Sequence, residues 1–446
     1  MNNLPDTFFL DFSIYEIIDK VNNRLIKSEC LLKHSLFIYK KFNPLYKPLK
    51  EFDINFKKVQ LLGSHNFKGI PFVAKDIMNT KDFKTEMGSE LWKGFEPGNN
   101  ARLIDSIILK GGILVGKSVT SEFGIHAPNE TLNPHNTLHK VGTSSSGSAV
   151  SVATGIVPFS LGTQTGGSIS RPASFCGVFG MKPTYGLIPR TGILKTTDTL
   201  DNPGFISSRL ESLRFILDAI RVKGKNYPYV YQNIDSKEIS FKNQTINIGF
   251  IKTPIWRYAK SYVKEYINNL LEKLDSSEKY LTQEIKGIDQ LNLMHKFHSI
   301  LYDKSISYYF KEEYQRNPNL ISKSTLEMIE RGLKIEPEEF QEALQYQKNN
   351  IEIIDKVFSN YDAIITVGTS SSAPKIDEEE IPDTSLIWTM LGIPSVCIPA
   401  GKCPNNMPFG IHFISSKYND YKLLDVLENL SKDEIISSKS IKFNAY

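Results

Sequence analysis

The sequence has few cysteines, and their spacing excludes most sites that are built on thiols. Cys30, Cys176, Cys397 and Cys403 are the four cysteines among 446 residues, and no two of them form a CxxC pair. Zinc sites and disulfide frameworks need closer spacing or more thiols. We therefore expect free cysteines in a reducing compartment and no metal site.

A strong charge of either sign is also missing. Lysine and arginine exceed aspartate and glutamate by a formal net charge of only +4, and the lysines are spread along the chain. Proteins that bind nucleic acid usually carry a clustered basic surface. The composition therefore implies no strong nucleic-acid footprint, and we expect that no contact with nucleic acid is required.

The sequence lacks any segment typical of a membrane span or a secretion signal. No apolar run approaches the length of about 18 residues that a membrane-spanning helix needs. The first residues, MNNLPDTFFLDFSIYEIIDK, have neither a basic start nor a continuous apolar stretch, and a signal peptide has both. We expect a cytoplasmic protein without membrane contact.

Helical and strand-like segments alternate along the chain, which is typical of the α/β class. Apolar residues at spacings of three and four predict helix in the first part, about 11–60, and several amphipathic helices over about 208–360. Strand-like runs stand at GIPFVAKDIMNT, ILVGK, YDAIITVG and SVCIPAG. No repeat or linker divides the chain, so we expect one unit that spans residues 1–446.

One motif is misleading. GGILVGKS, Gly111–Ser118, fits the pattern GxxxxGK[ST] of a phosphate-binding loop. Such a loop needs a strand before its first glycine and a helix after its last residue. Here a predicted helix, ARLIDSIILKGG, comes first, and residues 113–115 resemble a strand. We therefore reject nucleotide binding at this motif.

Two segments rich in glycine and hydroxyl residues are better candidates for chemistry. They are VGTSSSGSA, Val141–Ala149, and GTQTGGSISRPASFCG, Gly162–Gly177. Ser168 follows Gly166 and Gly167, where the lack of Cβ atoms lets backbone N–H groups approach a substrate oxygen. The pattern is not the GxSxG of α/β-hydrolases. A turn or linker is the alternative interpretation, although apolar residues follow at once.

These segments resemble the amidase signature family. The likeness is close across GTSSSGSAVSVATGIVPFSLGTQTGGSISRPASFCGVFGMKPTYGLIPRTG, and it includes GIPFVAKDIMNTKDFKTEMGS, GGILVGKSVTSEFG, DTLDNPG, YDAII and LGIPSVCIPAG. It covers most of the chain and is weakest at about 1–50 and 220–350. The resemblance implies an α/β fold in which α-helices cover both faces of a central mixed β-sheet.

We expect the single unit to divide into four parts with different roles. They are an N-terminal helical region at 1–60, a signature core with the catalytic residues at 61–210, a variable helical region that lines the substrate pocket at 211–360, and C-terminal core strands with a helix at 361–446.

The resemblance implies a catalytic triad of Ser168, Ser144 and Lys75. In the family, the serine after the double glycine is the nucleophile, and the first serine of the serine run, on a cis peptide, links it to the lysine. An ordinary lysine, with a pKa of about 10.4, is no base at neutral pH. Burial disfavours the charged form and lowers that pKa, and the apolar run FVAKDI indicates burial of Lys75. Ser168 would then attack an amide and form an acyl-enzyme.

The same resemblance implies an oxyanion hole made of backbone N–H groups of Thr165, Gly166 and Gly167, together with Ser168. Thr143 stands where the family often has glycine. Four further residues match family positions, and we expect mainly structural roles for them: Asp76, Thr163, Asp198 and Asp201. His295 and His298 stand at helical spacing, and we expect them to pack rather than to bind a metal.

Arg171 and Gln164 are the candidates for substrate binding. Many family members have the arginine two residues after the nucleophile and aspartate in place of Gln164, whereas Arg171 stands three residues after Ser168. This form is closer to stand-alone malonamidase-type amidases, in which the arginine can bind a substrate carboxylate. A guanidinium fork suits that role. The alternative is that Arg171 holds the loop by internal bonds.

We therefore expect a stand-alone amidase that hydrolyses a small-molecule amide. No cofactor, metal, nucleic acid or membrane enters this interpretation, and a homodimer is one option. Two alternatives stay open, namely the A-type glutaminase subunit of a tRNA-dependent amidotransferase and a non-catalytic member of the fold. The presence of Lys75, Ser144 and Ser168 argues against the last.

Overall fold

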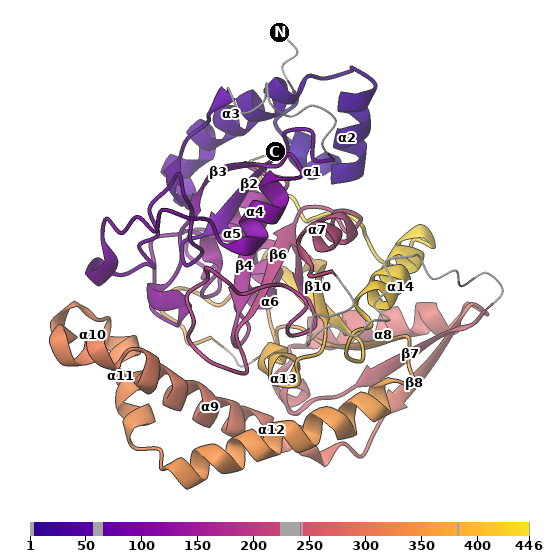
Figure 1. Ribbon diagram of the computed structural model, residues 1–446. Coiled ribbons are helices and arrows are strands. Elements are labelled where there is room, and N and C mark those ends of the chain that lie inside the picture. The colour runs from indigo at the N-terminus through magenta and orange to yellow at the C-terminus, as the bar shows by residue number, and fades with distance from the viewer. Residues whose placement is uncertain (1–3, 57–65, 224–240, 242–243, 381–382, 446) are drawn as a thin grey trace.

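The computed structural model describes residues 4–56, 66–223, 241, 244–380 and 383–445. Figure 1 shows a sheet that crosses the centre of the molecule, helices on both sides of it, and a group of long helices at the lower left. The strands are β1 Leu49–Phe52, β2 Pro71–Lys75, β3 Ile113–Ser118, β4 Phe159–Gln164, β5 Phe179–Lys182, β6 Asn202–Ser207, β7 Ile246–Ile251, β8 Tyr280–Ile285, β9 Ala363–Val367, β10 Ser395–Lys402 and β11 Pro408–Ile414.

The described strands form one sheet in the order β1-β3-β2-β4-β6-β5-β10-β11-β9-β7-β8. β2 runs parallel to β3 and β4, and β7 runs parallel to β8 and β9. The other pairs are antiparallel. This confirms the mixed sheet that the resemblance implies.

Helices from every part of the chain surround the sheet. Their bounds are α1 Phe8–Asp11, α2 Ile14–Asn22, α3 Ser28–Tyr46, α4 Arg102–Ile108, α5 Ser146–Ala153, α6 Ser170–Cys176, α7 Ser212–Ile220, α8 Ser261–Asp275, α9 Met294–Tyr309, α10 Lys311–Arg316, α11 Lys323–Leu333, α12 Pro337–Phe358, α13 Ser385–Met390 and α14 Asp420–Lys432. Short 3-10 turns separate some of them, and η3, Glu122–Gly124, adjoins the site described below.

Alternate residues of the central strands face opposite helical layers. In β2, Phe72 and Ala74 belong to a core that includes residues of α4, α7 and α14, whereas Val73 belongs to a core with residues of α3, α5 and α6. In β6, Phe205 and Ile206 divide in the same way. Successive side chains of a strand point to opposite faces. Both faces of the sheet are therefore buried, which confirms that helices cover both.

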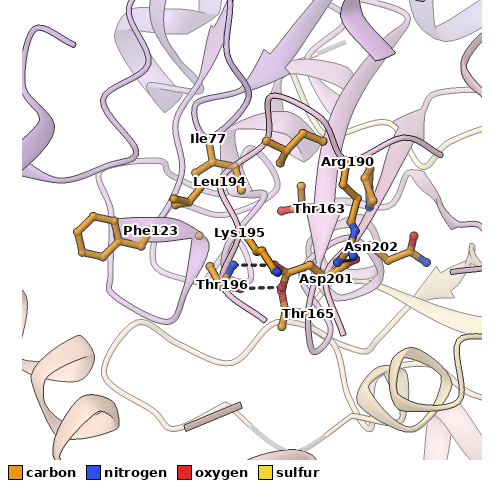
Figure 2. Close-up of a pocket in the computed structure, with 13 residues that line it drawn as sticks. Ile77, Phe123, Thr163, Thr165, Arg190, Leu194, Lys195, Thr196, Asp201 and Asn202 are labelled. Atoms are coloured by element: carbon orange, nitrogen blue, oxygen red, sulfur yellow. Dashed lines mark hydrogen bonds between the residues drawn. The ribbon is translucent and has the colours of Figure 1, made fainter. Parts of the chain in front are cut away.

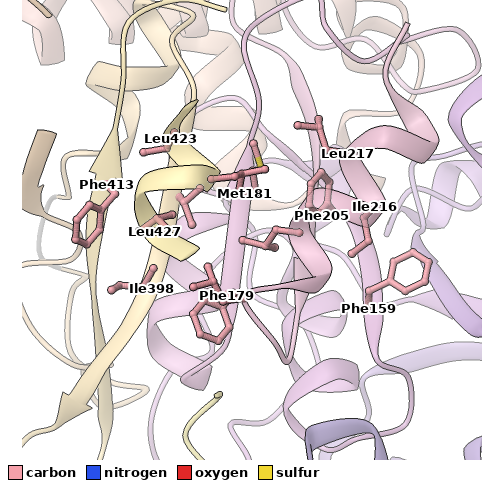
Figure 3. Close-up of a cluster of buried hydrophobic side chains, with 14 of the residues drawn as sticks. Phe159, Phe179, Met181, Phe205, Ile216, Leu217, Ile398, Phe413, Leu423 and Leu427 are labelled. Carbon is pink, nitrogen blue, oxygen red and sulfur yellow. The ribbon is translucent and has the colours of Figure 1, made fainter. Parts of the chain in front are cut away.

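Figure 3 shows the first of these layers. Met181 of β5 and Phe205 of β6 belong to one cluster with Leu217 of α7 and Leu427 of α14, and all four are buried. Each fully buried side chain of this size stabilises the fold by about 2–3 kcal/mol. This packing fixes the strands whose ends carry the site.

A second group of helices packs around its own apolar core at the β9 and β11 side of the sheet. Residues of α9, α11, α12 and α13 meet there, among them Leu301, Ile329, Ile354 and Trp388. Figure 1 shows α9, α11 and α12 as the long helices of this group. The group brings α9 and α13 towards the glycine-rich turn after β4.

Most of the predicted elements are confirmed. The serine-rich run forms α5, the segment after it forms β4, and YDAIITVG and SVCIPAG form β9 and β10. Helix α4 precedes Gly111, and β3 occupies the supposed phosphate loop. The predicted secondary structure around that motif is thus confirmed, and it is not that of a phosphate-binding loop.

Two helical predictions need correction. The region 208–360 also contains β7 and β8, which extend the sheet by two strands, so it is not wholly helical. Both strands are short, and the longer amphipathic helix α8 lies between them in sequence. The helical spacing of the apolar residues of α8 is therefore the strongest pattern in this segment, and it led to the helical prediction. Within the predicted helical region of 11–60, the structure has α2, α3 and the edge strand β1. Residues 57–60 lie outside the described ranges.

Across the ranges that the structure describes, no helix is apolar for long enough to traverse a bilayer. The C-terminal segment returns to the N-terminal helices, where Lys442 forms an ion pair with Asp11 at 2.5 Å and the ring of Phe443 contacts that of Phe42.

Candidate active site

Lys75 is the last residue of β2, and its side chain is fully buried, with 0% exposed. The ammonium nitrogen Nζ donates to Ser144 Oγ at 2.6 Å and to Thr163 Oγ1 at 2.9 Å. Burial lowers the pKa of Lys75 from 10.5 to about 7, and the negative charge of Asp201 opposes that change. A neutral amine is therefore accessible near neutral pH.

Ser144 follows Thr143 through a cis peptide bond and begins the turn that leads into α5. Its hydroxyl donates to the Gly124 carbonyl of η3 at 2.7 Å and accepts from Lys75. Gly124 has a φ of +70°, and a Cβ there would lie 3.2 Å from the Ile77 side chain. Glycine at this position lets the η3 backbone reach the Lys75–Ser144 pair.

Ser168 lies between β4 and α6, directly after the two glycines, and is 6% exposed. Its carbonyl accepts from the backbone N–H of Ser145 at 3.3 Å, so the turn that carries Ser144 lies against the turn that carries Ser168. The structure thus brings the three predicted catalytic residues, Lys75, Ser144 and Ser168, into one place from three segments of the chain.

The three carbonyls that precede the nucleophile each have a partner. The Thr165 carbonyl accepts from His298 Nε2 of α9 at 2.8 Å, and the Gly166 carbonyl accepts from Thr389 Oγ1 of α13 at 2.8 Å. The Gly167 carbonyl accepts from the backbone N–H of Arg171 at 2.8 Å. Burial lowers the pKa of His298 to about 4, so its ring is neutral at pH 7 and must carry its proton on Nε2.

These contacts orient the N–H groups of the turn. In a trans peptide the C=O and the following N–H point in opposite directions. Fixing the carbonyls of Thr165, Gly166 and Gly167 therefore also fixes the N–H groups of Gly166, Gly167 and Ser168. The N–H of Gly166 thus points away from α9, that of Gly167 away from α13, and that of Ser168 away from the start of α6.

Gln164 is fully buried at the end of β4 and holds the same turn. Its Oε1 accepts from the backbone N–H groups of Ile169 and Ser170, both at 3.0 Å, and its Nε2 donates to Thr389 Oγ1 at 3.0 Å. Its side chain is thus engaged within the protein. A role in substrate binding stays a prediction.

Arg171 is engaged by two carboxylates. Its Nε donates to Asp383 Oδ2 at 2.6 Å and its Nη1 donates to Glu380 Oε2 at 2.7 Å, with a longer contact from Nη1 to Thr143 Oγ1 at 3.3 Å. These contacts match the alternative in which the arginine holds the loop. In this conformation the guanidinium has no free fork for a substrate carboxylate.

A cavity of about 210 Å³ adjoins the Lys75–Ser144 pair. Gly124 and Thr163, which contact that pair, line it. Figure 2 shows the apolar side chains of Phe123 and Leu194 on one side of the cavity. Asp201 lies among threonine side chains on the other side.

Asp201 is a structural anchor at this cavity. Its Oδ1 accepts from the hydroxyls of Thr165 at 2.8 Å, Thr196 at 2.6 Å and Thr197 at 2.9 Å. Its Oδ2 accepts from the backbone N–H of Thr196 at 2.7 Å (Figure 2). The carboxylate therefore joins the nucleophile turn to the segment before β6.

The other family-matched residues are also placed. Thr163 contacts Lys75 directly. Asp76 forms a buried ion pair with Lys117 at 2.9 Å, and Asp198 forms an exposed pair with Lys195. Among the described residues, no three histidine, cysteine or acidic side chains gather in a way that could hold a metal ion.

Sequence reasoning missed four residues around the turn, namely His298, Thr389, Glu380 and Asp383. His298 stands among the apolar residues of α9 that are buried, and a polar side chain in such a position needs a hydrogen-bond partner. For the others, no local pattern points to the site, because α13 and the segment before it meet the turn only in the folded chain.

Comparison with known proteins gives a consistent answer. A family model described as Amidase matches residues 57–424. The A-type subunit of glutamyl-tRNA(Gln) amidotransferase from Natranaerobius thermophilus is 27% identical and covers 95% of this chain and 92% of that protein. Its counterpart from Staphylococcus haemolyticus is 28% identical and covers 92% of both.

Two solved structures share the fold. The A-type subunit of glutamyl-tRNA(Gln) amidotransferase from Thermotoga maritima superposes with a TM-score of 0.80 at 24% identity, over 95% of both chains. The native peptide amidase of Stenotrophomonas maltophilia superposes with a TM-score of 0.80 at 20% identity, over 95% of this chain and 97% of that one.

These relatives contradict one prediction from the sequence. We expected a small-molecule amide substrate, no required contact with nucleic acid, and a homodimer as an option. The relatives are named as subunits of an enzyme that acts on a transfer RNA. The low net charge is a poor guide here, because a subunit of a complex that acts on a nucleic acid does not itself need a strongly basic surface when other subunits bind the nucleic acid.

Proposed function

This chain belongs to the amidase family and is an amide-hydrolysing enzyme, and from its site we propose that it works through a Ser168 acyl-enzyme, with Ser144 and neutral Lys75 as the proton relay. One observation carries the proposal. A fully buried lysine with a lowered pKa lies 2.6 Å from the hydroxyl of Ser144.

The proposed reaction begins with Ser168. As its oxygen attacks the amide carbon, its proton passes to Ser144, and the Ser144 proton passes to neutral Lys75. The C–N bond then breaks, and the proton returns along the same path to the leaving nitrogen, which departs as ammonia. Water hydrolyses the ester, releases the carboxylic acid and restores Ser168.

In this proposal the negative charge that develops on the carbonyl oxygen is held by N–H groups of the nucleophile turn. The groups of Gly166, Gly167 and Ser168 are the best supported, because the carbonyl before each of them has a fixed partner. Donors fixed in advance need no rearrangement in the transition state, and the loss of one typically costs about 10²–10³ in rate. The N–H of Thr165 is the fourth predicted donor. The hydroxyl of Thr165 donates to Asp201 and its carbonyl accepts from His298, so this residue also holds the turn.

For the biological role, we propose that the ammonia serves the amidation of glutamyl-tRNA(Gln), with glutamine as the amide donor and companion subunits holding the tRNA. The support is the similarity to the A-type subunits of two bacteria across nearly their whole length. The motif differs from many such subunits at Gln164 and Arg171, so the donor is the part of the proposal that most needs a test.

The test measures ammonia release from glutamine by the purified chain. The chain is assayed alone and together with the companion subunits of its own source and glutamyl-tRNA(Gln), with Ser168→Ala as the control. We expect release that needs Ser168 and rises at least tenfold in the assembly. Ser168-dependent release that the assembly leaves unchanged would contradict the amidotransferase role. Release that persists in Ser168→Ala would contradict the mechanism.

A further inference from the structure

The charges around Arg171 do not cancel. One guanidinium meets two carboxylates, those of Asp383 and Glu380. All three groups are largely withdrawn from solvent, and Asp383 most of all, with 1% of its side chain exposed. Asp383 is also fixed from a second side, because its Oδ1 accepts from the backbone N–H of Ser385 at 2.8 Å. The cluster therefore carries a net charge of −1.

This negative cluster borders the nucleophile turn. A Cβ added at Gly167 would lie 2.8 Å from Asp383 Oδ2 and 3.1 Å from Nη2 of Arg171. Gly167 immediately precedes Ser168. Nη1 of Arg171 also lies 3.3 Å from Oγ1 of Thr143, which immediately precedes Ser144. The cluster thus borders the residues directly before both Ser168 and Ser144.

In the described part of the chain, four histidines interact electrostatically with the cluster, and burial lowers the pKa of each of them, namely His126, His295, His298 and His412. Burial lowers the pKa values of His126 and His298 to about 4, so both rings are neutral at pH 7. Arg331 of α11, whose charge acts on His126, is paired with Asp303 at 2.7 Å. The fixed charge on this side of the site therefore stays negative.

Glu380 and Asp383 differ in what they can offer a ligand. Asp383 is held by Arg171 and Ser385 and is closed off from solvent. Glu380 is 19% exposed, the largest fraction of the three, and pairs with Arg171 through Oε2. Its side chain can meet a ligand without the loss of the Arg171–Asp383 pair.

We propose that the Arg171–Asp383–Glu380 cluster is a charge filter at the Ser168 site: it admits amide donors that bring an ammonium or an uncharged group to this side and disfavours donors that bring a carboxylate, with Glu380 as the selecting residue. The inference rests on the proposed role of Ser168. From the sequence, Arg171 predicts a donor with a carboxylate, whereas the cluster predicts a donor with an ammonium or an uncharged group.

The test compares three amides of equal chain length, namely 4-aminobutanamide, butanamide and succinamate. Two readouts are taken for each amide. The first is kcat/KM for ammonia release. The second is the concentration that halves covalent labelling of Ser168 by a neutral fluorophosphonate, which requires no turnover. Glu380→Gln is the test variant. Glu312→Gln on α10, whose carboxylate is exposed and paired with Arg316 at 2.8 Å, is the matched control for net charge.

We expect succinamate to be at least about tenfold weaker than 4-aminobutanamide, the size of effect that one nearby charge has at moderate effective dielectric. Glu380→Gln should reduce that ratio several-fold, mainly through KM, while Glu312→Gln leaves it as in the native chain. Succinamate that binds as well as 4-aminobutanamide, or a ratio that Glu380→Gln leaves intact, would overturn the filter. A native chain that the fluorophosphonate cannot label at Ser168 would overturn the proposed function instead.

Discussion

The lowered pKa of Lys75 makes a quantitative prediction about the pH dependence of the reaction. A lysine with a pKa of about 7 is about half neutral at pH 7, whereas a lysine with its ordinary pKa is neutral in only about 1 molecule in 3,000. The fall from 10.5 to about 7 corresponds to about 5 kcal/mol against the charged form. Burial supplies this, and the charge of Asp201 offsets part of it.

The sign follows directly. The relay needs the neutral amine, so kcat/KM should rise with pH, with an apparent pKa of about 7, and level off above it. The assay is ammonia release between about pH 5.5 and 9.5 at constant ionic strength. Lys75→Arg should lower kcat/KM by at least about 10³ at every pH, because a guanidinium stays protonated over this range.

Lys182 provides a matched control. It is also fully buried, and burial lowers its pKa to about 7 as well, but its Nζ donates to the carbonyls of Pro183 and Ile393. Lys182→Arg should leave the apparent pKa of the profile unchanged even where it lowers the thermal stability. A native profile that is flat across this pH range, or a Lys75→Arg variant with more than about a tenth of native activity, would refute the relay.

Three further predictions concern the surroundings of the nucleophile. Asp201→Asn should move the apparent pKa of the kcat/KM profile below 7, because the negative charge of Asp201 stabilises protonated Lys75 and the variant lacks that charge. An unchanged or higher apparent pKa would contradict this. Thr389→Val and His298→Phe should each lower kcat about tenfold with little change in KM, because each removes a bond that orients the turn; steady-state kinetics in which KM alone rises would exclude a positioning role. Gly167→Ala should lower kcat more than about 100-fold, because its Cβ would meet Asp383 at 2.8 Å, and retained activity in a folded variant would show that the turn can relax.

The parts of the fold that the sequence predicts are those with a local cause. β4, FSLGTQ, is a short strand in which Phe159 and Leu161 alternate with small residues, and it is bounded by Pro158 and the glycine-rich turn. α5 is a compact run of small residues after the serine turn. β7 and β8 escaped prediction because each has six residues and stands beside long amphipathic helices with a stronger period. β7 joins the sheet by pairing with β9, which begins more than 75 residues after the end of β8, and β8 joins it by pairing with β7.

The site divides in the same way. Lys75, Ser144 and Ser168 lie in dense, specific motifs, so the family resemblance places them residue by residue. The contacts that orient the turn join residues far apart in sequence, with a separation of 133 positions for His298 and Thr165 and 223 for Thr389 and Gly166. In the sequence, His298 is one polar residue on a helix and Thr389 is one hydroxyl beside a tryptophan. Neither sequence context indicates that the side chain of His298 or Thr389 donates to a backbone carbonyl of the nucleophile turn.

The origin of these contacts bears on how the enzyme can diverge. Two of the three partners of the turn carbonyls come from α9 and α13, and α9 lies in the region where the family resemblance is weakest. In the proposed mechanism, a change in that region would therefore also act on the N–H groups that are proposed to stabilise the transition state. A substitution that moves α9 relative to the turn alters kcat through the Thr165 carbonyl even when no substrate contact is lost. In this proposal specificity and rate are coupled through backbone carbonyls that α9 and α13 hold, whereas the Lys75–Ser144 contact is held by residues of β2, β4 and η3.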